Sequence, residues 1–403
     1  MNTYLRFLFL LICFFWGLNA NVLQAVAQDD SFVEIKDGVP TATWGSIHRF
    51  SASCNALETA FTIDVLLPEG YDALKSDGYP VIYANDGQNL FDDAISFAGI
   101  SWDIDGSLGK LRDKDLISDA IVVGIHNRGT LRPADYIPEK VCKEYIAAAD
   151  RQNSGMWTLT GGIFNADEYA AFVAGTVKSN IDRLYNTASD RAHTFLMGSS
   201  MGALAALYTM CEYPDVFGGA ACLSTHWIGD FNYSNTIFPE AMYRYLDVSL
   251  PSPSDHKIYT DRGTVDLDAA YAPWETKMRS LMRQKGYDES SGSLLTYTAE
   301  GASHNEFYWA QRVDRPLSFL LGLPSSVYEP EKPFEEKFNL ISLEGSEIIV
   351  HAYQTTEAIL SRLDGQNIIL KLQPGVNRFT VPVPGLYILA VPGGPALKLF
   401  VRP

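Results

Sequence analysis

One short stretch of the sequence has the residues of a nucleophilic serine site. Gly198-Ser199-Ser200-Met201-Gly202 follows an apolar run, 193–197, and precedes a helical pattern, 203–213. A serine on a sharp strand-to-helix turn needs glycine two positions before and after it, because neighbouring backbone crowds the turn. At the helix start, the backbone N–H of Met201 can stabilise a negative oxygen. The stretch therefore predicts Ser200 as a nucleophile for acyl transfer.

A serine hydroxyl needs a base to take its proton, and the predicted base is His304. In α/β enzymes with this serine turn, the chain order is serine, acid, histidine. His304 lies in a glycine-containing segment after the strand-like run 294–298, where the base belongs. His226 follows the nucleophile too closely and is instead expected to line the pocket, with a structural role as the alternative. His256 precedes a strand and would lie at the opposite edge of the sheet.

The acid that orients the histidine is expected after the strand-like run 257–260. Three aspartates lie there, Asp261, Asp266 and Asp268. We predict Asp266, because a carboxylate beyond the intervening glycine turn would lie over the carboxyl edge of the sheet beside His304. Asp261 is then expected to cap the turn and Asp268 to begin the helix.

A second oxyanion donor and the pocket wall are expected from two other segments. The segment 85–89, after the run 81–84, contains a glycine that lets the backbone N–H of Gln88 turn toward the serine, although an ordinary turn explains this glycine equally well. Trp227, beside His226, is expected to line the substrate pocket, with core packing as the alternative. This chemistry needs no metal and no organic cofactor.

The elements that must position these residues alternate along the chain. From residue 61, short apolar runs alternate with longer amphipathic stretches. The runs are 61–67, 81–84, 121–125, 193–197, 219–224 and 257–260, and the stretches include 166–184, 203–213 and 274–285. Most runs are apolar throughout, as expected of strands buried on both faces of a sheet that helices cover. The pattern predicts a doubly wound α/β domain over residues 28–323.

Both ends of the chain depart from this pattern. Residues 1–27 combine Arg6, an apolar run and a small-residue site, which predicts a cleaved signal peptide and export. Residues 324–336 are rich in proline and glutamate and are predicted to be a linker. Residues 337–403 contain strand-like runs without a helical period, which predicts a small all-β sandwich.

Charge and cysteine content restrict the partners. The net charge is −17, which disfavours nucleic acid, and no segment after the leader is apolar enough to span a membrane. Four cysteines, Cys54, Cys142, Cys211 and Cys222, follow the leader. They can form disulfides in an exported chain or remain buried thiols, and their spacing does not choose between these states.

Five linked motifs resemble a known enzyme family. They are 86–92, Arg132 with 135–138, 198–202 continuing through 213–217, 263–266, and 304–306. Over about residues 61–323 the chain resembles the Putative esterase family of α/β-hydrolases, which includes feruloyl and acetyl-xylan esterases, enterochelin esterases, S-formylglutathione hydrolases and mycolyltransferases. The resemblance implies an α/β-hydrolase fold, a triad of Ser200, Asp266 and His304, and oxyanion donors at Gln88 and Met201. Ala203 and Asp135 depart from the family's usual glycine and glutamate, but neither change affects the triad.

The end of the chain has a second resemblance. Segments 385–389 and 397–401 resemble the end of sorting domains used for type IX secretion in Bacteroidetes-type bacteria, which would make the secretion machinery a partner. A small accessory or carbohydrate-contacting sandwich is the alternative.

These features together predict an exported serine carboxylesterase that works through an acyl-enzyme. The expected substrate is a small-molecule or oligosaccharide ester, and acetyl or feruloyl esters of plant cell-wall carbohydrate are favoured. This preference rests on analogy with the family and not on any residue. A siderophore esterase is the enzymatic alternative, which basic residues converging on the pocket would support. A non-catalytic surface protein that binds through its C-terminal sandwich is the alternative of another class.

Overall fold

The computed structural model describes residues 32–323, 338–344, 347–352, 355–362, 367–381, 383, 385–390 and 396–401. The chain forms two compact units, Met1–Tyr328 and Glu329–Pro403, and each is described by itself. The predicted signal peptide and linker lie outside the described residues. In the described part of the chain, no helix has the length and apolar character needed to cross a membrane.

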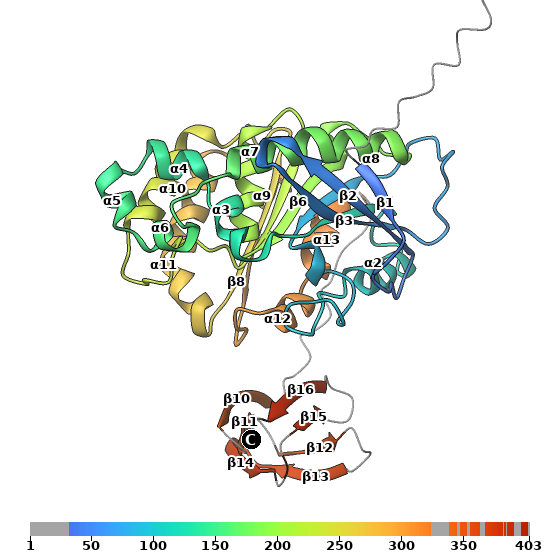
Figure 1. Cartoon of the computed structure of the whole chain (residues 1–403), viewed down its shortest axis with the longest axis vertical. Helices are drawn as coiled ribbons and strands as arrows, with labels where there is room; N and C mark the ends of the chain where they lie inside the picture. Colours follow the sequence, from blue (N-terminus) through green and yellow to red (C-terminus); the bar gives the residue numbers. More distant parts are fainter. Residues whose placement is uncertain are drawn as a thin grey trace, which may run out of the picture. The chain divides into compact units, whose positions relative to one another are not determined.

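A nine-stranded sheet forms the centre of the first unit (Figure 1). Its strands are β1 (Phe32–Ile35), β2 (Ser46–Cys54), β3 (Thr59–Leu67), β4 (Val81–Asn85), β5 (Ile121–Ile125), β6 (Thr194–Ser199), β7 (Gly219–Leu223), β8 (Lys257–Gly263) and β9 (Leu294–Ala299). Their order is β1-β2-β3-β5-β4-β6-β7-β8-β9. From β5 to β9 neighbouring strands are parallel, whereas β1, β2, β3 and β5 pair antiparallel. The predicted strands are confirmed; β1 and β2 were not predicted, because β2 is largely polar.

Helices cover both faces of this sheet (Figure 1). They are α2 (Ile104–Asp113), α3 (Arg132–Tyr136), α4 (Glu139–Glu144), α5 (Ala148–Gln152), α6 (Gly155–Thr160), α7 (Ala166–Phe172), α8 (Lys178–Leu184), α9 (Met201–Glu212), α10 (Ile237–Ser249), α11 (Asp266–Gln284), α12 (Glu306–Ala310) and α13 (Asp314–Leu321). Short turns of other helix types occur at Asn55–Leu57, Gly87–Asn89, Gly129–Leu131, Val173–Val177 and Arg191–His193. Helix α11 begins at Asp266, before the predicted start at residue 274. Pro273 lies inside this helix, whereas proline is usually found in the first turn of a helix.

The central strands are buried on both faces, as their apolar sequences predicted. In β4, Val81 and Tyr83 belong to the core cluster that includes α9, whereas Ile82 and Ala84 belong to the cluster that includes α2 and α13. Helix α9 packs on β4, β6 and β7, and α13 packs on β7 and β8. The doubly wound α/β architecture is therefore confirmed, and it brings the carboxyl ends of β6, β7, β8 and β9 to one edge.

The second unit consists of two short antiparallel sheets. Its strands are β10 (Phe338–Glu344), β11 (Glu347–Ala352), β12 (Thr356–Arg362), β13 (Asn367–Leu372), β14 (Gly375–Thr380), β15 (Gly385–Ala390) and β16 (Ala396–Val401). The sheet orders are β10-β11-β14 and β13-β12-β15-β16. Val350 from the first sheet and Leu360 from the second share one apolar core. The predicted small all-β domain is thus confirmed.

Candidate active site

Ser200 occupies the sharp turn between β6 and α9. Its backbone dihedrals are φ 56° and ψ −123°, a conformation that is costly for a residue with a side chain. A Cβ on Gly198 would lie 2.3 Å from the carbonyl oxygen of Gly202, and a Cβ on Gly202 would lie 2.9 Å from Asp86 Oδ2. Only glycine fits at these two positions, which is the steric requirement that the sequence motif expressed.

His304 lies against the Ser200 side chain. Its Nε2 is 2.9 Å from Ser200 Oγ, so the hydroxyl can donate to the imidazole. Its ring packs edge-on against Trp309 and Tyr271, with centroid distances of 5.0 and 5.6 Å. The segment between β9 and α12 thus brings the predicted base to the predicted nucleophile.

The acid in contact with His304 is Asp268, and not Asp266 as predicted. Asp268 Oδ1 lies 2.5 Å from His304 Nδ1, and the Asp268 side chain is fully buried. Asp266, the first residue of α11, is exposed and accepts a hydrogen bond from Ser303 Oγ. Two positions along a helix rotate a side chain by about 200°, so only one of the two aspartates can face the imidazole.

Hydrogen bonds keep the Asp268 carboxyl ionised. Its Oδ2 accepts from Ser224 Oγ and from the backbone N–H of Gly263, each at 2.6 Å. Burial acts to raise the pKa of Asp268, but the bonds from His304, Ser224 and Gly263 outweigh burial and hold this pKa below its ordinary value. A carboxylate therefore faces the imidazole.

The other two residues weighed at this sheet edge have structural positions. Asp261, expected to cap the turn, lies inside β8 and forms a buried ion pair with Arg312, with N–O distances of 2.9 and 3.0 Å. His256 directly precedes β8, with Nε2 2.8 Å from the Pro214 carbonyl oxygen. His256 is thus remote from the Ser200 edge, as expected.

The loop after β4 carries Gln88, and an ion pair anchors it. Arg132 donates to both carboxylate oxygens of Asp86 at 2.7 Å, and Asn127 Nδ2 donates to Oδ1 at 2.7 Å. Burial disfavours the charged guanidinium, but the Asp86 carboxylate outweighs it, so the pKa of Arg132 is raised. Gln88 and Ser200 line one cavity. Met201 is the first residue of α9, where a backbone N–H has no partner within the helix.

His226 and Trp227 were predicted to line the pocket, but both side chains are fully buried. His226 Nδ1 lies 2.7 Å from the Tyr271 hydroxyl, and its Nε2 has no hydrogen-bond partner among the described residues. Burial, with smaller effects from His304 and Arg132, lowers the pKa of His226 to about 3. Trp227 Nε1 donates to Glu275. Neither residue is among those that line the cavity at Ser200, and both lie in the core.

The cavity at Ser200 has a volume of about 390 Å³. Most of the residues that line it have polar side chains, and the full set is Asp86, Gln88, Asn89, Phe97, Asn127, Gly129, Arg132, Ser199, Ser200, His304, Glu306 and Trp309. Burial raises the pKa of Glu306, whose Oε1 lies 3.4 Å from Asn89 Nδ2. Phe97 is 89% exposed. Sequence reasoning did not place Phe97, Asn127 or Trp309 here, because each comes from a loop or helix end whose direction no pattern reports.

Comparison with known proteins identifies the family. The family model described as "Putative esterase" matches residues 54–320. The chain belongs to this family. The esterase is therefore a carboxylic ester hydrolase, and the family resemblance inferred from the sequence motifs is confirmed.

Individual relatives of the esterase are distant. It is 20% identical over 262 residues to the uncharacterized protein YbbA of Bacillus subtilis (strain 168), covering 64% of this chain and 90% of YbbA. A solved ferulic acid esterase is similar with a TM-score of 0.50 and 15% identity, covering 69% of this chain and 98% of that one. The enterochelin esterase of Shigella flexneri is similar with a TM-score of 0.51 and 13% identity, covering 70% of this chain and 60% of that one. These structural likenesses show the α/β-hydrolase fold.

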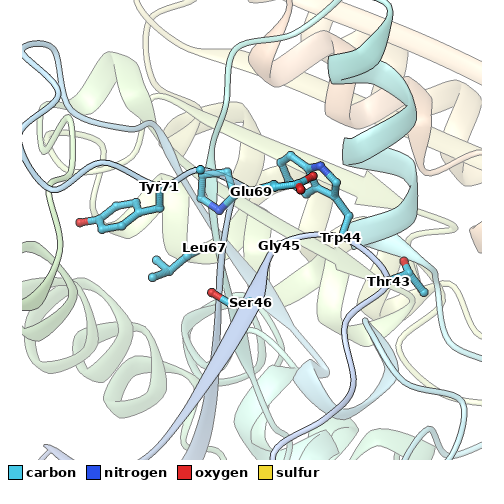
Figure 2. A pocket seen from close by; sticks show the side chains of 9 residues that line it. Thr43, Trp44, Gly45, Ser46, Leu67, Glu69 and Tyr71 are labelled. Atoms are coloured by element: carbon cyan, nitrogen blue, oxygen red, sulfur yellow. The ribbon is translucent and has the colours of Figure 1, made fainter.

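A second cavity of the esterase, of about 550 Å³, lies beside the loop before β2 (Figure 2). Trp44, Leu67, Glu69 and Tyr71 are among its lining residues. None of the residues predicted to act on an ester lines it. The cavity that contains Ser200 and His304 is therefore the candidate active site, although it is the smaller of the two.

Two further features of the esterase concern its cysteines and metals. Cys54, Cys142, Cys211 and Cys222 are all buried free thiols, so of the two sequence alternatives the structure has the thiols. Burial raises the pKa of Cys142 and Cys222, which makes them poor nucleophiles. Within the described residues, no cluster of three His, Cys, Asp or Glu side chains is arranged to hold a metal ion.

Proposed function

We propose that this protein is an exported serine carboxylesterase whose catalytic residues are Ser200, His304 and Asp268. The observation that carries the proposal is the 2.9 Å contact between Ser200 Oγ and His304 Nε2, with Asp268 at 2.5 Å from Nδ1. This arrangement is the one that activates a serine for attack on a carbonyl carbon.

The reaction has two steps. His304 takes the Ser200 proton as Oγ bonds to the ester carbonyl carbon, and it returns that proton to the departing alcohol oxygen. Water, deprotonated by His304, then attacks the acyl-enzyme, and the proton goes back to Ser200 Oγ. Asp268 stabilises the imidazolium in both steps. The backbone N–H groups of Met201 and Gln88 stabilise the oxyanions.

The cavity lining supports a hydroxylated substrate. Asn89, Asn127 and Glu306 offer amide and carboxyl groups that can bind sugar hydroxyls, and the exposed ring of Phe97 can pack on a sugar face or an aryl acyl group. We therefore propose acetyl or feruloyl esters of plant cell-wall carbohydrate as substrates. The similar ferulic acid esterase is consistent with this class.

An anionic siderophore fits the same cavity less well. Among the described residues that line it, Arg132 is the only lysine or arginine, and Asp86 neutralises its charge. Glu306 adds a further carboxyl. The converging basic residues that a ferric catecholate would require are thus not found in this lining.

Two matched variants test the mechanism. Asp268→Asn should lower kcat by about 10⁴-fold, the effect of losing the acid of a serine triad. Asp266→Asn is its control and should retain kcat within about twofold. A fluorophosphonate probe should label the wild type and not Ser200→Ala; a folded, unlabelled wild type would support the non-catalytic alternative. Equal loss in both aspartate variants would contradict the assignment of Asp268.

A substrate panel tests the substrate class. Acetylated and feruloylated xylooligosaccharides should be hydrolysed, whereas catecholate esters should not. The opposite result would overturn the carbohydrate proposal and leave the serine mechanism intact.

Export and the role of the C-terminal unit rest on sequence. Residues 1–27 support a cleaved leader, and N-terminal sequencing of protein collected outside the cell should find a start near Gln28. The C-terminal unit is proposed to serve as a sorting or accessory domain. If it sorts, deleting residues 329–403 should block delivery to the cell surface; unchanged delivery would favour the accessory role.

A further inference from the structure

The Ser224 hydroxyl lies directly behind the acid that contacts His304. Ser224 follows β7, is fully buried and has a φ of 44°. Its Oγ donates to Asp268 Oδ2 at 2.6 Å. The same oxygen accepts from Trp309 Nε1 at 3.0 Å and from an Arg312 guanidinium nitrogen at 2.8 Å. No sequence motif singled out this serine.

The two accepted bonds determine where the Ser224 proton points. A hydroxyl has one proton to donate and two lone pairs that accept. Arg312 and Trp309 carry N–H groups that can only donate, and they occupy both lone pairs. The hydroxyl proton is therefore directed at Asp268.

A buried ion pair fixes Ser224 in this position. Arg312 binds both oxygens of Asp261 and also the Tyr308 carbonyl oxygen, at 3.0 Å. The Ser224 backbone N–H donates to Asp261 Oδ1 at 3.0 Å. The backbone and side chain of Ser224 are thus held by the same pair, which explains how a non-glycine residue keeps a positive φ here.

We propose that Ser224 is a positioning residue that aims Asp268 at His304 during ester hydrolysis. Ser224 and the Gly263 N–H both occupy Oδ2, which leaves Oδ1 for the imidazole. This inference rests on the proposed function, because it assumes that Asp268 orients the catalytic base.

Removing the hydroxyl has a definite expected effect. A hydrogen bond to a charged group typically contributes enough to change a rate by about 10- to 100-fold. Ser224→Ala should lower kcat within that range and leave KM within about twofold, because Ser224 does not line the cavity at Ser200. The hydrogen bond from Ser224 helps to lower the pKa of the Asp268 carboxyl, so its loss should raise this pKa and move the acidic limb of the kcat/KM profile to higher pH.

The experiment compares Ser224→Ala with a control variant, Ser318→Ala, which also removes one buried hydroxyl. In the part of the chain that the structure describes, Ser318 Oγ has no hydrogen-bond partner, and Ser318 lies on α13, outside the contacts of the triad. Ser224→Gly accompanies them, since glycine adopts a φ of 44° without strain and keeps the test valid if the alanine variant does not fold. Each variant is also made in the Asp268→Asn background.

Three results decide the outcome. The proposal expects the kcat loss and pH shift in the Ser224 variants, neither in Ser318→Ala, and little additional loss from Ser224→Ala once Asp268 is asparagine. A Ser224→Ala loss that is undiminished in the Asp268→Asn background, or equal to that of Ser318→Ala, would overturn it. If Asp268→Asn alone retains full kcat, the proposed triad fails instead.

Discussion

His226 should make the first unit sensitive to acid. The ring is fully buried, and burial lowers its pKa from 6.5 to about 3, so the folded state holds it neutral while the unfolded chain can protonate it. Its stabilising contribution is complete above pH 6.5 and is lost as pH falls toward 3. Each pH unit in this window removes about 1.4 kcal/mol, so about 2 kcal/mol is lost between pH 7 and pH 5.

The assay compares wild type with His226→Gln, which keeps a polar side chain but does not titrate. All seven tryptophans precede the second unit, so their fluorescence during urea unfolding reports on the first unit. Other titrating groups are common to both proteins. The free energy of unfolding of wild type should therefore fall between pH 7 and pH 5 by about 2 kcal/mol more than that of the variant. Equal losses in both proteins would refute the argument that a buried neutral imidazole causes this sensitivity.

Three other outcomes are expected. Gly198→Ala should lower kcat about 100-fold or more, because its Cβ would lie 2.3 Å from the Gly202 carbonyl oxygen and would displace Ser200; an active, stable variant would show that the turn tolerates a side chain. Burial lowers the pKa of Lys257 to about 8, so the folded state favours the neutral amine and the free energy of unfolding of the wild type should rise by about 2 kcal/mol between pH 7 and pH 10. Lys257→Met should abolish this rise, which urea unfolding at both pH values checks. Leu360→Ala should destabilise the C-terminal unit by about 2–5 kcal/mol with unchanged esterase activity, because this leucine belongs to a separate core; loss of activity would contradict the independence of the two units.

Local chemistry explains which features were predictable. The turn around Ser200 needs two glycines, and the central strands need apolar residues on both faces, so the motif and the strands are written in short stretches of sequence. The position of His304 follows from chain order, since it comes after β9, a strand whose carboxyl end shares the edge of Ser200. These inferences needed only neighbouring residues and the direction of parallel strands.

The direction of individual side chains could not be predicted in the same way. Asp266 and Asp268 both follow β8, and only the start of α11 decides which carboxylate faces the imidazole. His226 and Trp227 follow β7 with no periodic pattern. Their hydrogen-bond partners, Tyr271 and Glu275, lie on α11, which is distant in the sequence.

By itself, the sequence determined the fold class, the predicted strands and the residues proposed as nucleophile and base, because each depends on residue type and local spacing. Only the tertiary structure decided which aspartate contacts His304, which residues line the cavity and which bonds hold Ser224, because these depend on contacts between segments far apart in the chain. A hydrogen bond requires a distance and an angle, and both are set by how complete elements pack.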